Sequence, residues 1–378
     1  MENADVKYSL RQLMLYFLKL GATGFGGPAA LVGYMHRDLV EKRQWISEQD
    51  YKEGLALAQL APGPLAAQLA IYLGYVHYRI LGATLVGIAF VIPSFIMVVA
   101  LGYAYKLYGG LPWMQAVFYG ISAAVIGIIA MSSYKLVNKS IGKDYVLWAI
   151  FIVTALFTII TEAESVWLFL ISGLIYWAYK RQTNRVKSFA PFILGFLGLT
   201  VSETDTLTKI ALFFAKAGAF VFGSGLAIVP FLYSGVVKEY HWLNEQQFLD
   251  SVAVAMITPG PVVITVGFIG YLVAGFKGAS VAALATFLPC YLLTIIPAPY
   301  FKKYGHKPDI KAIVDGVTAA AIGAISGAVI VLGKKSLIDI PTVLIALATI
   351  FILWKFKKIQ EPYIILIAAL IGFVIKSI

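Results

Sequence analysis

Long apolar stretches constrain the fold of this chain more than any other feature of its sequence. A helix needs about 20 apolar residues to cross a hydrocarbon core about 30 Å thick, and only 13% of these 378 residues are charged, against roughly 25% in a soluble domain. The stretches are continuous and do not alternate as in a membrane β-barrel. We therefore expect an all-α polytopic membrane protein with about 13 transmembrane segments, near residues 10–31, 52–74, 80–104, 113–134, 145–161, 164–180, 189–201, 207–232, 248–273, 278–300, 310–333, 338–354 and 361–377.

The positive charges lie mostly in the connections between these stretches. A cytoplasmic N-terminus puts about eighteen Lys and Arg residues inside and about nine outside, in agreement with the positive-inside rule. We therefore predict a multi-pass protein of the plasma membrane, the inner membrane of a bacterial cell, with its N-terminus in the cytoplasm. Topology explains the net charge of +11 without nucleic acid as a partner. Cys290 is the single cysteine, and we expect neither a metal nor another cofactor.

The second half of the sequence repeats the first. The segment Phe17–Gly21 returns as Phe214–Gly218, and Pro62-Gly-Pro64 returns as Pro259-Gly-Pro261, each 197 residues later. One residue is then lost, and Gly, Pro and Ala residues continue to match, among them Gly74 with Gly270, Pro93 with Pro289 and Gly120 with Gly316. Chance does not keep so many helix breakers in register, so the chain is a tandem duplication.

The connection between the two halves predicts their relative orientation. Each half holds about six apolar segments, and the short one at 189–201 lies between them. An odd number of crossings in the connection inverts the second half, which predicts two inverted-topology repeats, the architecture of secondary transporters. The alternative is a duplication kept only for packing. The predicted domains are an N-terminal repeat at 1–188, a connecting transmembrane segment at 189–203 and an inverted C-terminal repeat at 204–378.

Helix-breaking residues interrupt the predicted segments at equivalent places in the two halves. Proline removes a backbone donor and clashes with the preceding turn, and unwound backbone at membrane depth needs protein or a water-filled cavity around it. The half-helix N-termini that result attract anions. The alternative is simple proline kinks. The candidate substrate-binding residues in the breaks are Gly24, Gly26, Gly27, Pro28, Pro62, Gly63, Pro64, Gly223, Ser224, Gly225, Thr258, Pro259, Gly260 and Pro261.

Polar side chains accompany these breaks. Thr23, Gln68 and Thr265, together with Ser224 and Thr258, are placed to hydrogen-bond the oxygens of an oxyanion. The alternative is that such hydroxyls bond back to their own helix.

Two lysines occupy matching positions just before the glycine-rich breaks. Lys19 is the only charge between Arg11 and Arg37, and Lys216 the only one between Lys209 and Lys238. A lysine deep in the bilayer is costly, so it is a functional candidate by default, and two ammonium groups facing one cavity would neutralise a dianion. The alternative is that each lysine extends to the membrane interface.

Glu53 and Asp250 also match, early in the helices that lead to the two Pro-Gly-Pro motifs. Ser47 and Asn244 are the expected N-caps of these helices, with Asp50 and Gln247 at the third position of a capping box. Desolvation makes a carboxyl group easier to protonate, so these residues are our candidates for carrying a coupling proton. A structural carboxylate near a helix start is the alternative.

The motif set GATGFGGP and PGP, with its counterparts FVFGSG and TPGP, resembles the chromate ion transporter (CHR) family in its long, two-domain form. The resemblance covers nearly the whole chain. It implies an inner-membrane carrier that exports chromate, a tetrahedral dianion like sulfate, with the proton gradient as energy source. It also places the family's glycine and proline motifs on the break residues, although Ser224-Gly225 stands where the first half has Gly27-Pro28.

These observations together predict a secondary transporter for a tetrahedral divalent oxyanion, most specifically a chromate exporter. The alternatives are a permease for sulfate or another oxyanion and, in a different class, a membrane-embedded enzyme. We expect no enzyme, because no histidine lies within a predicted segment and Cys290 stands alone. The expected partners are the oxyanion, membrane lipid and a second copy of the chain in a homodimer.

Overall fold

The computed structural model describes residues 8–25, 27–109, 111–162, 166–183, 205–220, 225, 228–304, 308–356 and 359–377. All regular secondary structure in these ranges is helical, as predicted. The candidates Gly26, Gly223 and Ser224 and the short apolar stretch at 189–201 lie outside the described residues.

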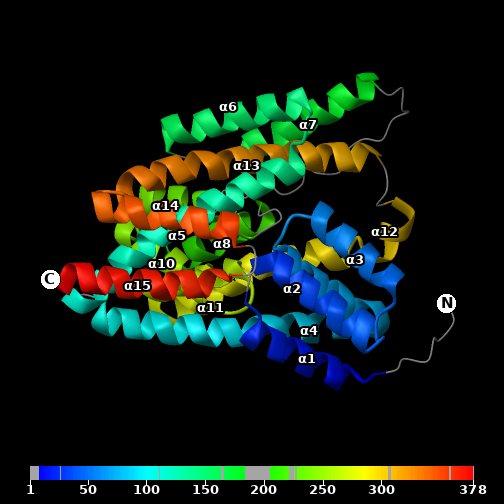
Figure 1. Cartoon of the computed structure of the whole chain (residues 1–378). Coiled ribbons are helices and arrows are strands. Elements are labelled where there is room, and N and C mark those ends of the chain that lie inside the picture. The colour runs from blue at the N-terminus through cyan, green and yellow to red at the C-terminus, as the bar shows by residue number, and fades with distance from the viewer. Residues whose placement is uncertain are drawn as a thin grey trace.

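The helices of the second half repeat those of the first in order (Figure 1). The first half contains α1 (Leu10–Thr23), α2 (Gly27–Met35), the π-helical η1 (His36–Lys42), α3 (Glu48–Leu60), α4 (Leu65–Tyr108), α5 (Pro112–Ser140), α6 (Tyr145–Thr161) and α7 (Val166–Thr183). The second contains α8 (Thr206–Phe220), α9 (Ile228–Leu232), the π-helical η3 (Tyr233–Glu239), α10 (Glu245–Ile257), the 3₁₀ turn η4 (Val262–Ile264), α11 (Thr265–Ile295), α12 (Ala298–Tyr304), α13 (Pro308–Ser336), α14 (Ile340–Lys355) and α15 (Glu361–Ser377). Helices α3 and α10 begin 197 residues apart, and α5 and α13 begin 196 apart, which are the offsets of the sequence repeat.

Side-chain caps set the starts of the two short helices that precede the Pro-Gly-Pro motifs. Ser47 Oγ accepts the Asp50 amide at 3.0 Å before α3. Before α10, Asn244 and Gln247 exchange hydrogen bonds of 2.8 and 3.0 Å in a capping box. These bonds satisfy first-turn amides that have no partner within the helix, so both predicted N-caps are confirmed.

Four helical stretches are long and apolar enough to cross a membrane: Leu65–Tyr108, Pro112–Asn138, Val262–Phe301 and Pro308–Ser336. Tyr145–Thr161 and Ile340–Lys355 are shorter apolar helices. Since a crossing helix needs about 20 residues, these stretches make the chain a multi-pass membrane protein.

The chain reverses at each Pro-Gly-Pro motif. Gly54 of α3 faces Tyr72 of α4 so closely that a Cβ on Gly54 would lie 2.3 Å from the ring, although a straight helix would separate these positions by about 27 Å. In the second half, the Thr265 hydroxyl donates to the Ser251 carbonyl at 2.8 Å. Two helical hairpins result, with the motifs at their tips. The helix does end at each motif, as predicted, but the predicted single crossings through these motifs are wrong.

The glycine-rich break after α1 is also a turn. Helix α1 ends at Thr23, and the Tyr16 hydroxyl donates to the Tyr34 carbonyl of α2 at 3.2 Å, whereas a straight helix would hold these residues about 27 Å apart. The predicted crossing near 10–31 is therefore wrong in the same way.

Helices α4 and α11 each fold back a second time. Backbone angles leave the helical region at Arg79 in α4 and at Ala274 and Gly275 in α11. A Cβ on Gly74 would lie 2.5 Å from the Gly82 carbonyl oxygen, which a continuous helix would place about 12 Å away along its axis. Each of these helices thus has a first arm that completes the hairpin and a long second arm, residues 80–108 in α4 and 276–295 in α11.

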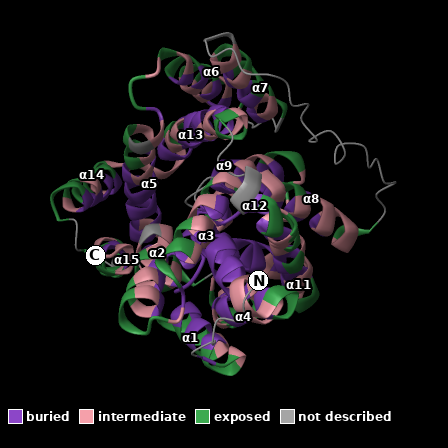
Figure 2. Ribbon diagram, turned by 90° about the vertical axis from the view of Figure 1, so that its right-hand side faces the viewer, coloured by how far each residue is buried: buried purple, intermediate pink, exposed green. Residues whose placement is uncertain are grey.

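The last two helices of each half pack on the other half. Helices α6 and α7 lie against α13, and α14 and α15 lie against α5; Figures 1 and 2 show α6 and α7 beside α13 at one edge of the molecule. A Cβ on Gly120 of α5 would lie 1.9 Å from the Ala368 oxygen of α15, and one on Gly316 of α13 would lie 2.5 Å from the Ser172 oxygen of α7. Small residues permit this close approach between membrane helices. We call this arrangement the helix exchange.

Candidate functional site

Glycine holds each hairpin tip in a conformation that other residues avoid. Gly63 has φ +141° and Gly260 has φ +92°, values that cost an L-residue strain. The Gly260 amide donates to the Gly24 carbonyl at 2.9 Å. This bond joins the second-half tip to the glycine-rich turn of the first half, so two of the predicted breaks meet.

Each tip also packs on the long arm of the opposite half. A Cβ on Gly260 would lie 2.1 Å from Ser94 Oγ in α4, and one on Gly63 would lie 3.1 Å from Cys290 Sγ in α11. Ser94 and Cys290 are fully buried and directly follow the repeated prolines. We call Gly63, Gln68 and Cys290 the first tip site, and Gly24, Ser94 and Gly260 the second tip site.

The remaining break residues lie in or beside these turns. Pro64 and Pro261 are the N-caps of α4 and η4, and Thr258 is the C-cap of α10. Pro62 and Pro259 precede the tip glycines, and Gly27 and Pro28 open α2. Gly225 is buried with φ +75°. The proline pairs thus flank each tip and end one helix before the next begins.

Hydroxyl groups near the tips bond back to their own hairpins or helices. Thr23 donates to the Lys19 carbonyl at 2.8 Å, Thr258 to the Val254 carbonyl at 3.1 Å, and Thr265 to the Ser251 carbonyl. The contacts of Thr23 and Thr258 match the alternative given for such hydroxyls, whereas Thr265 of α11 donates across the hairpin to α10. Gln68 differs, because its Nε2 donates to the Pro62 carbonyl at 2.8 Å while its Oε1 is buried without a partner.

The two candidate carboxylates occupy unequal environments. Glu53 is half-buried, receives a bond of 3.1 Å from Gln49 and lies 3.4 Å from the Tyr72 hydroxyl. Asp250 is 2% exposed and receives bonds of 2.8 Å from Gln246 and 2.6 Å from Tyr105. Both recorded partners of Asp250 are uncharged, and the tyrosine comes from the other half.

Lys19 and Lys216 do not lie with these groups. Both side chains are exposed. The buried face of α1 is formed by Leu13, Phe17 and Leu20 among others, and Lys19 projects from the opposite face. Their exposure on the protein surface separates the two lysines from the buried tips.

A charged cluster ties the start of α10 to three other segments. Lys335 of α13 contacts Glu245 and lies 3.2 Å from Glu162, and Lys238 of η3 lies 2.7 Å from Glu162. Hydrogen bonds from Lys238 and Lys335 hold the pKa of Glu162 below its usual range. We call these four residues the Lys335 network.

The ion pairs of Glu48 at the start of α3 stay within the first half. Glu48, which matches Glu245, pairs with His36 at 2.9 Å and with Lys52 at 3.1 Å. Since exposed pairs contribute little to stability, this end of the first hairpin is held less firmly than its counterpart.

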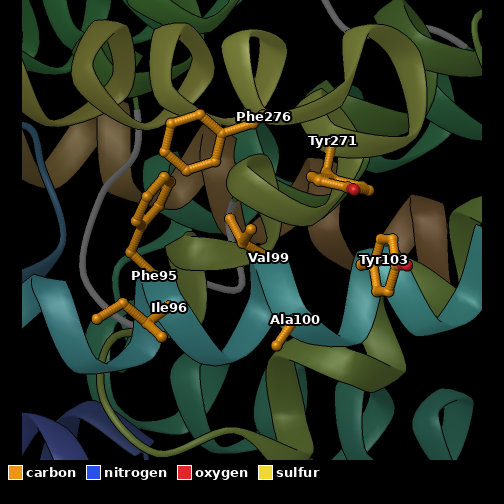
Figure 3. A pocket seen from close by; sticks show the side chains of 7 residues that line it. All are labelled: Phe95, Ile96, Val99, Ala100, Tyr103, Tyr271 and Phe276. Carbon is orange, nitrogen blue, oxygen red and sulfur yellow. The ribbon is translucent and has the colours of Figure 1, made fainter.

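A pocket of about 390 Å³ lies between α4 and α11 (Figure 3). Its polar atoms are confined to two tyrosine hydroxyls, which suits an apolar group and not an oxyanion. Its lining residues are Phe95, Ile96, Val99, Ala100, Tyr103, Tyr271 and Phe276. Within the described ranges, no group of three or more His, Cys, Asp or Glu side chains is placed to hold a metal ion.

The sequence of the chain matches the family model described as "Chromate transporter" twice, over residues 11–177 and 208–373. The chain belongs to the chromate transporter family. It is 67% identical to the "Chromate transport protein" of Cupriavidus metallidurans over 97% of this chain and 93% of that protein. It is 64% identical to the "Probable chromate transport protein" of Synechococcus elongatus, covering 98% and 96%. The "Chromate transport protein" of Pseudomonas aeruginosa is 29% identical, covering 97% and 92%. No solved structure matches the chain.

Membership in the chromate transporter family makes this chain a membrane transport protein and not an enzyme. The matches cover both hairpins, both tips and most of the exchanged helices. The tip sites are therefore the part of this family's fold in which we seek the substrate.

Sequence reasoning missed three features of the site. Ser94 and Cys290 were not singled out, although each follows a repeated proline at one constant offset. Tyr105 was not linked to Asp250, because 145 residues separate them and no local pattern joins them. The Lys335 network was missed because its members come from four distant segments.

Proposed function

We propose that this protein exports chromate across the cytoplasmic membrane as a proton-coupled secondary active transporter. The single observation that carries the proposal is that two glycine-tipped hairpins from the two halves each pack on the long arm of the other half. Hairpins and broken helices at membrane depth are tolerated where they line a site. The names of the relatives supply chromate as the substrate.

The two repeats are inverted with respect to one another in this proposal, and they exchange access to a site between the tips. Equivalent contacts cross the repeat boundary in both directions, Gly260 with Ser94 and Gly63 with Cys290. A pair of such contacts lets one hairpin close as the other opens. The units that move correspond to the domains expected at 1–188 and 204–378, joined by 189–203.

The substrate binds at the first turns that follow the tips. Amides in the first turn of a helix lack intrahelical acceptors and carry partial positive charge, which favours an oxyanion. The Pro-Gly-Pro residues and Gly24 form the site directly, and Lys19 and Lys216 lie outside it. The proposed binding site is therefore smaller than the set of candidate substrate-binding residues predicted from the sequence.

Asp250 carries the coupling proton, with Glu53 as its counterpart in the other half. Burial without a cationic partner favours the neutral form of a carboxyl group, and Asp250 has only neutral donors recorded beside it. Proton binding would neutralise this group and change its hydrogen bonds to Tyr105 and Gln246. The bond to Tyr105 links α10 to α4, and the bond to Gln246 lies within α10.

The N-terminus lies in the cytoplasm in this proposal, because that orientation follows the positive-inside rule. The two hairpins enter the membrane without crossing it, so they reduce the number of full crossings from the thirteen expected. Lipid surrounds the exposed apolar faces. We also propose that the protein forms a homodimer, which a measurement of its molecular mass in detergent would test.

The test is flux of radiolabelled chromate into proteoliposomes of the purified chain, with and without an imposed pH gradient. We expect saturable flux that follows the gradient and is lost in Asp250→Asn. Flux of sulfate without flux of chromate would make the protein a sulfate permease. Absence of flux of either anion under every gradient would overturn the proposed function.

A further inference from the structure

Gln68 presents a buried acceptor that no described residue satisfies. Its side chain has no exposed surface, and its Nε2 donates to the Pro62 carbonyl at 2.8 Å. That bond fixes which amide atom is the nitrogen, because the Pro62 carbonyl oxygen can accept a hydrogen bond from the NH2 group but not from the amide oxygen. The other amide atom, Oε1, has no hydrogen-bond partner; in the described part of the chain only Ser336 Oγ shares this state. A buried acceptor without a partner costs free energy, so a bound molecule that brings a donor would fit here.

The start of a helix supplies backbone amides in the same segment as Gln68. Gln68 lies in the first turn of α4, where backbone amides have no acceptor in their own helix. Ala66 and Ala67 in this turn are 2% and 1% exposed. The amide of Gln68 also lies over the tip, since a Cβ on Gly63 would be 2.6 Å from its Nε2. The first tip site thus combines one buried acceptor with the first-turn amides of a helix.

This combination distinguishes two forms of a tetrahedral oxyanion. A fully ionised anion has only acceptor oxygens, and one of them would face the lone pairs of Gln68 Oε1. A monoprotonated anion keeps three oxygens for the backbone amides and donates its hydroxyl to Oε1. A site that hydrogen-bonds a substrate hydroxyl rejects analogues that lack it more strongly than an apolar pocket does.

We propose that Gln68 accepts a hydrogen bond from the hydroxyl of a monoprotonated tetrahedral oxyanion, and that hydrogen chromate is the form of chromate that binds. The proposal rests on the proposed function and adds a residue that determines specificity. Hydrogen chromate is present near neutral pH, whereas hydrogen sulfate is a strong acid and is fully ionised there. Gln68 therefore selects chromate over sulfate, two anions of the same shape and the same full charge.

The second half lacks this acceptor. The position that matches Gln68 at an offset of 196 is Ile264, which is fully buried, and the next residue is Thr265, whose hydroxyl already donates to Ser251. Selection of the protonated anion is thus a property of the first tip site. Thr265→Val provides a matched control in the second half.

Titratable groups of the protein must be separated from the proton on the ligand. Elements packed around α4 bring tyrosines and Cys290, which ordinarily titrate above neutral pH. The carboxyl groups on these elements are Glu48, Asp50 and Glu53 of α3 and Glu245 and Asp250 of α10. Helix α4 itself carries His77, and histidine is the side chain that ordinarily titrates near neutral pH. Because the proposed proton belongs to the anion, His77→Gln should leave the pH dependence of chromate binding in place.

The test is equilibrium binding of radiolabelled chromate to the purified full chain between about pH 6 and about pH 8, with sulfate as competitor. One linked proton makes the Kd for total chromate rise about tenfold per pH unit once hydrogen chromate is the minor form. We expect sulfate to bind at least about 100-fold more weakly than chromate. Affinity for chromate that is independent of pH, or sulfate that competes as well as chromate, would overturn the inference while leaving oxyanion transport intact.

Two variants at position 68 separate the acceptor from the rest of the side chain. Gln68→Met removes it at similar volume, and we expect the Kd for chromate at the acid end to rise about 10-fold and the preference over sulfate to disappear. Gln68→Glu keeps an acceptor, loses the donor to Pro62 and adds a negative charge, so we expect weaker binding of both anions with the preference for chromate retained. Loss of that preference would overturn the inference. No chromate binding by the unaltered chain at any pH would remove the proposed function and this inference together.

Discussion

Glu53 and Asp250 occupy the same position in two copies of one hairpin, yet their surroundings differ. Glu53 is half-buried and its tyrosine, Tyr72, comes from the same hairpin at 3.4 Å. Asp250 is buried and its tyrosine, Tyr105, reaches across from the other half at 2.6 Å. The second hairpin is thus locked to its neighbour at a place where the first is not.

Part of this difference is written into the sequence. Tyr72 matches Phe268 and Tyr105 matches Phe301 at the offset of 196. Each carboxylate therefore has one tyrosine partner, Glu53 from the first arm of α4 and Asp250 from the long second arm. The starts of the hairpins follow the same trend, since the Lys335 network holds α10 and local pairs hold α3. The hairpin that carries Asp250 is therefore tied to the first half through Tyr105 and through Glu162 of the Lys335 network.

The largest expected effect comes from neutralising the two carboxylates in separate variants, which tests whether they differ in function as they do in burial. Asp250→Asn removes the group that we propose binds the coupling proton, and it should lower gradient-driven chromate flux by about 10- to 100-fold, the usual size of a coupling free energy between two sites. Glu53→Gln should lower it by only a few-fold. Proteoliposome flux measures both, and equal losses would show that burial does not decide which carboxylate couples.

The tip glycines give the next largest effect. Gly260→Ala forces a Cβ to 2.1 Å from Ser94 Oγ at φ +92°, and we expect it to cost about 1–3 kcal/mol of stability. Adding Ser94→Gly should recover the part due to the clash and leave the backbone strain. Thermal unfolding of the purified variants checks this. A Gly260→Ala protein as stable as the parent would mean that the tip relaxes freely.

Removing the tyrosine hydroxyls measures how much each carboxylate's hydrogen bond contributes to stability. Tyr105→Phe deletes a buried bond to a carboxyl group and should destabilise the protein by about 1.5–3 kcal/mol. Tyr72→Phe deletes a longer bond to a half-buried group and should cost roughly 0.5 kcal/mol or less. Denaturation midpoints of the two variants would be compared directly, and a reversed order would contradict the assignment of Asp250 as the locked site.

The smallest expected effect concerns acid pH. Bonds from Lys238 and Lys335 lower the pKa of Glu162 in the folded state, so its contribution to stability is present above the unfolded value of about 4.3 and is lost as the pH falls through the folded value. Glu162→Gln should remove this component. Glu48→Gln, at the start of the other hairpin, should have a smaller effect because its pairs with His36 and Lys52 are exposed. Melting temperatures measured from neutral to acid pH test this prediction. Identical acid profiles for Glu162→Gln and the parent would show that the Lys335 network does not contribute to the pH dependence of stability.

The sequence was a sound guide where structure depends on local chemistry. Caps at Ser47 and Asn244, helix ends at the Pro-Gly-Pro motifs and the constant offset all follow from residues that act on their immediate neighbours. The direction taken after each motif could not be predicted in this way. Proline and glycine end a helix, but the contact of Gly54 with Tyr72 decides where the next one runs.

The exposed position of Lys19 could have been predicted. Leu13, Phe17 and Leu20 recur at spacings of four and three, which defines the buried face of α1. Lys19 lies two residues beyond Phe17, about 200° around the helix, and so belongs to the opposite face. The partner of Asp250 offered no comparable signal, because Tyr105 meets it only through tertiary packing.

The helix exchange has a consequence for the order in which this protein is made. Roughly 120 residues separate the end of α7 from the start of α13, which takes about 6–25 s at ordinary synthesis rates. During that time the faces of α6 and α7 that bear Thr154, Thr158 and Ser172, all buried in the finished protein, have no α13 to pack against. The first half therefore cannot complete its fold when its own synthesis ends, and the whole chain matures only when α13, α14 and α15 have entered the membrane.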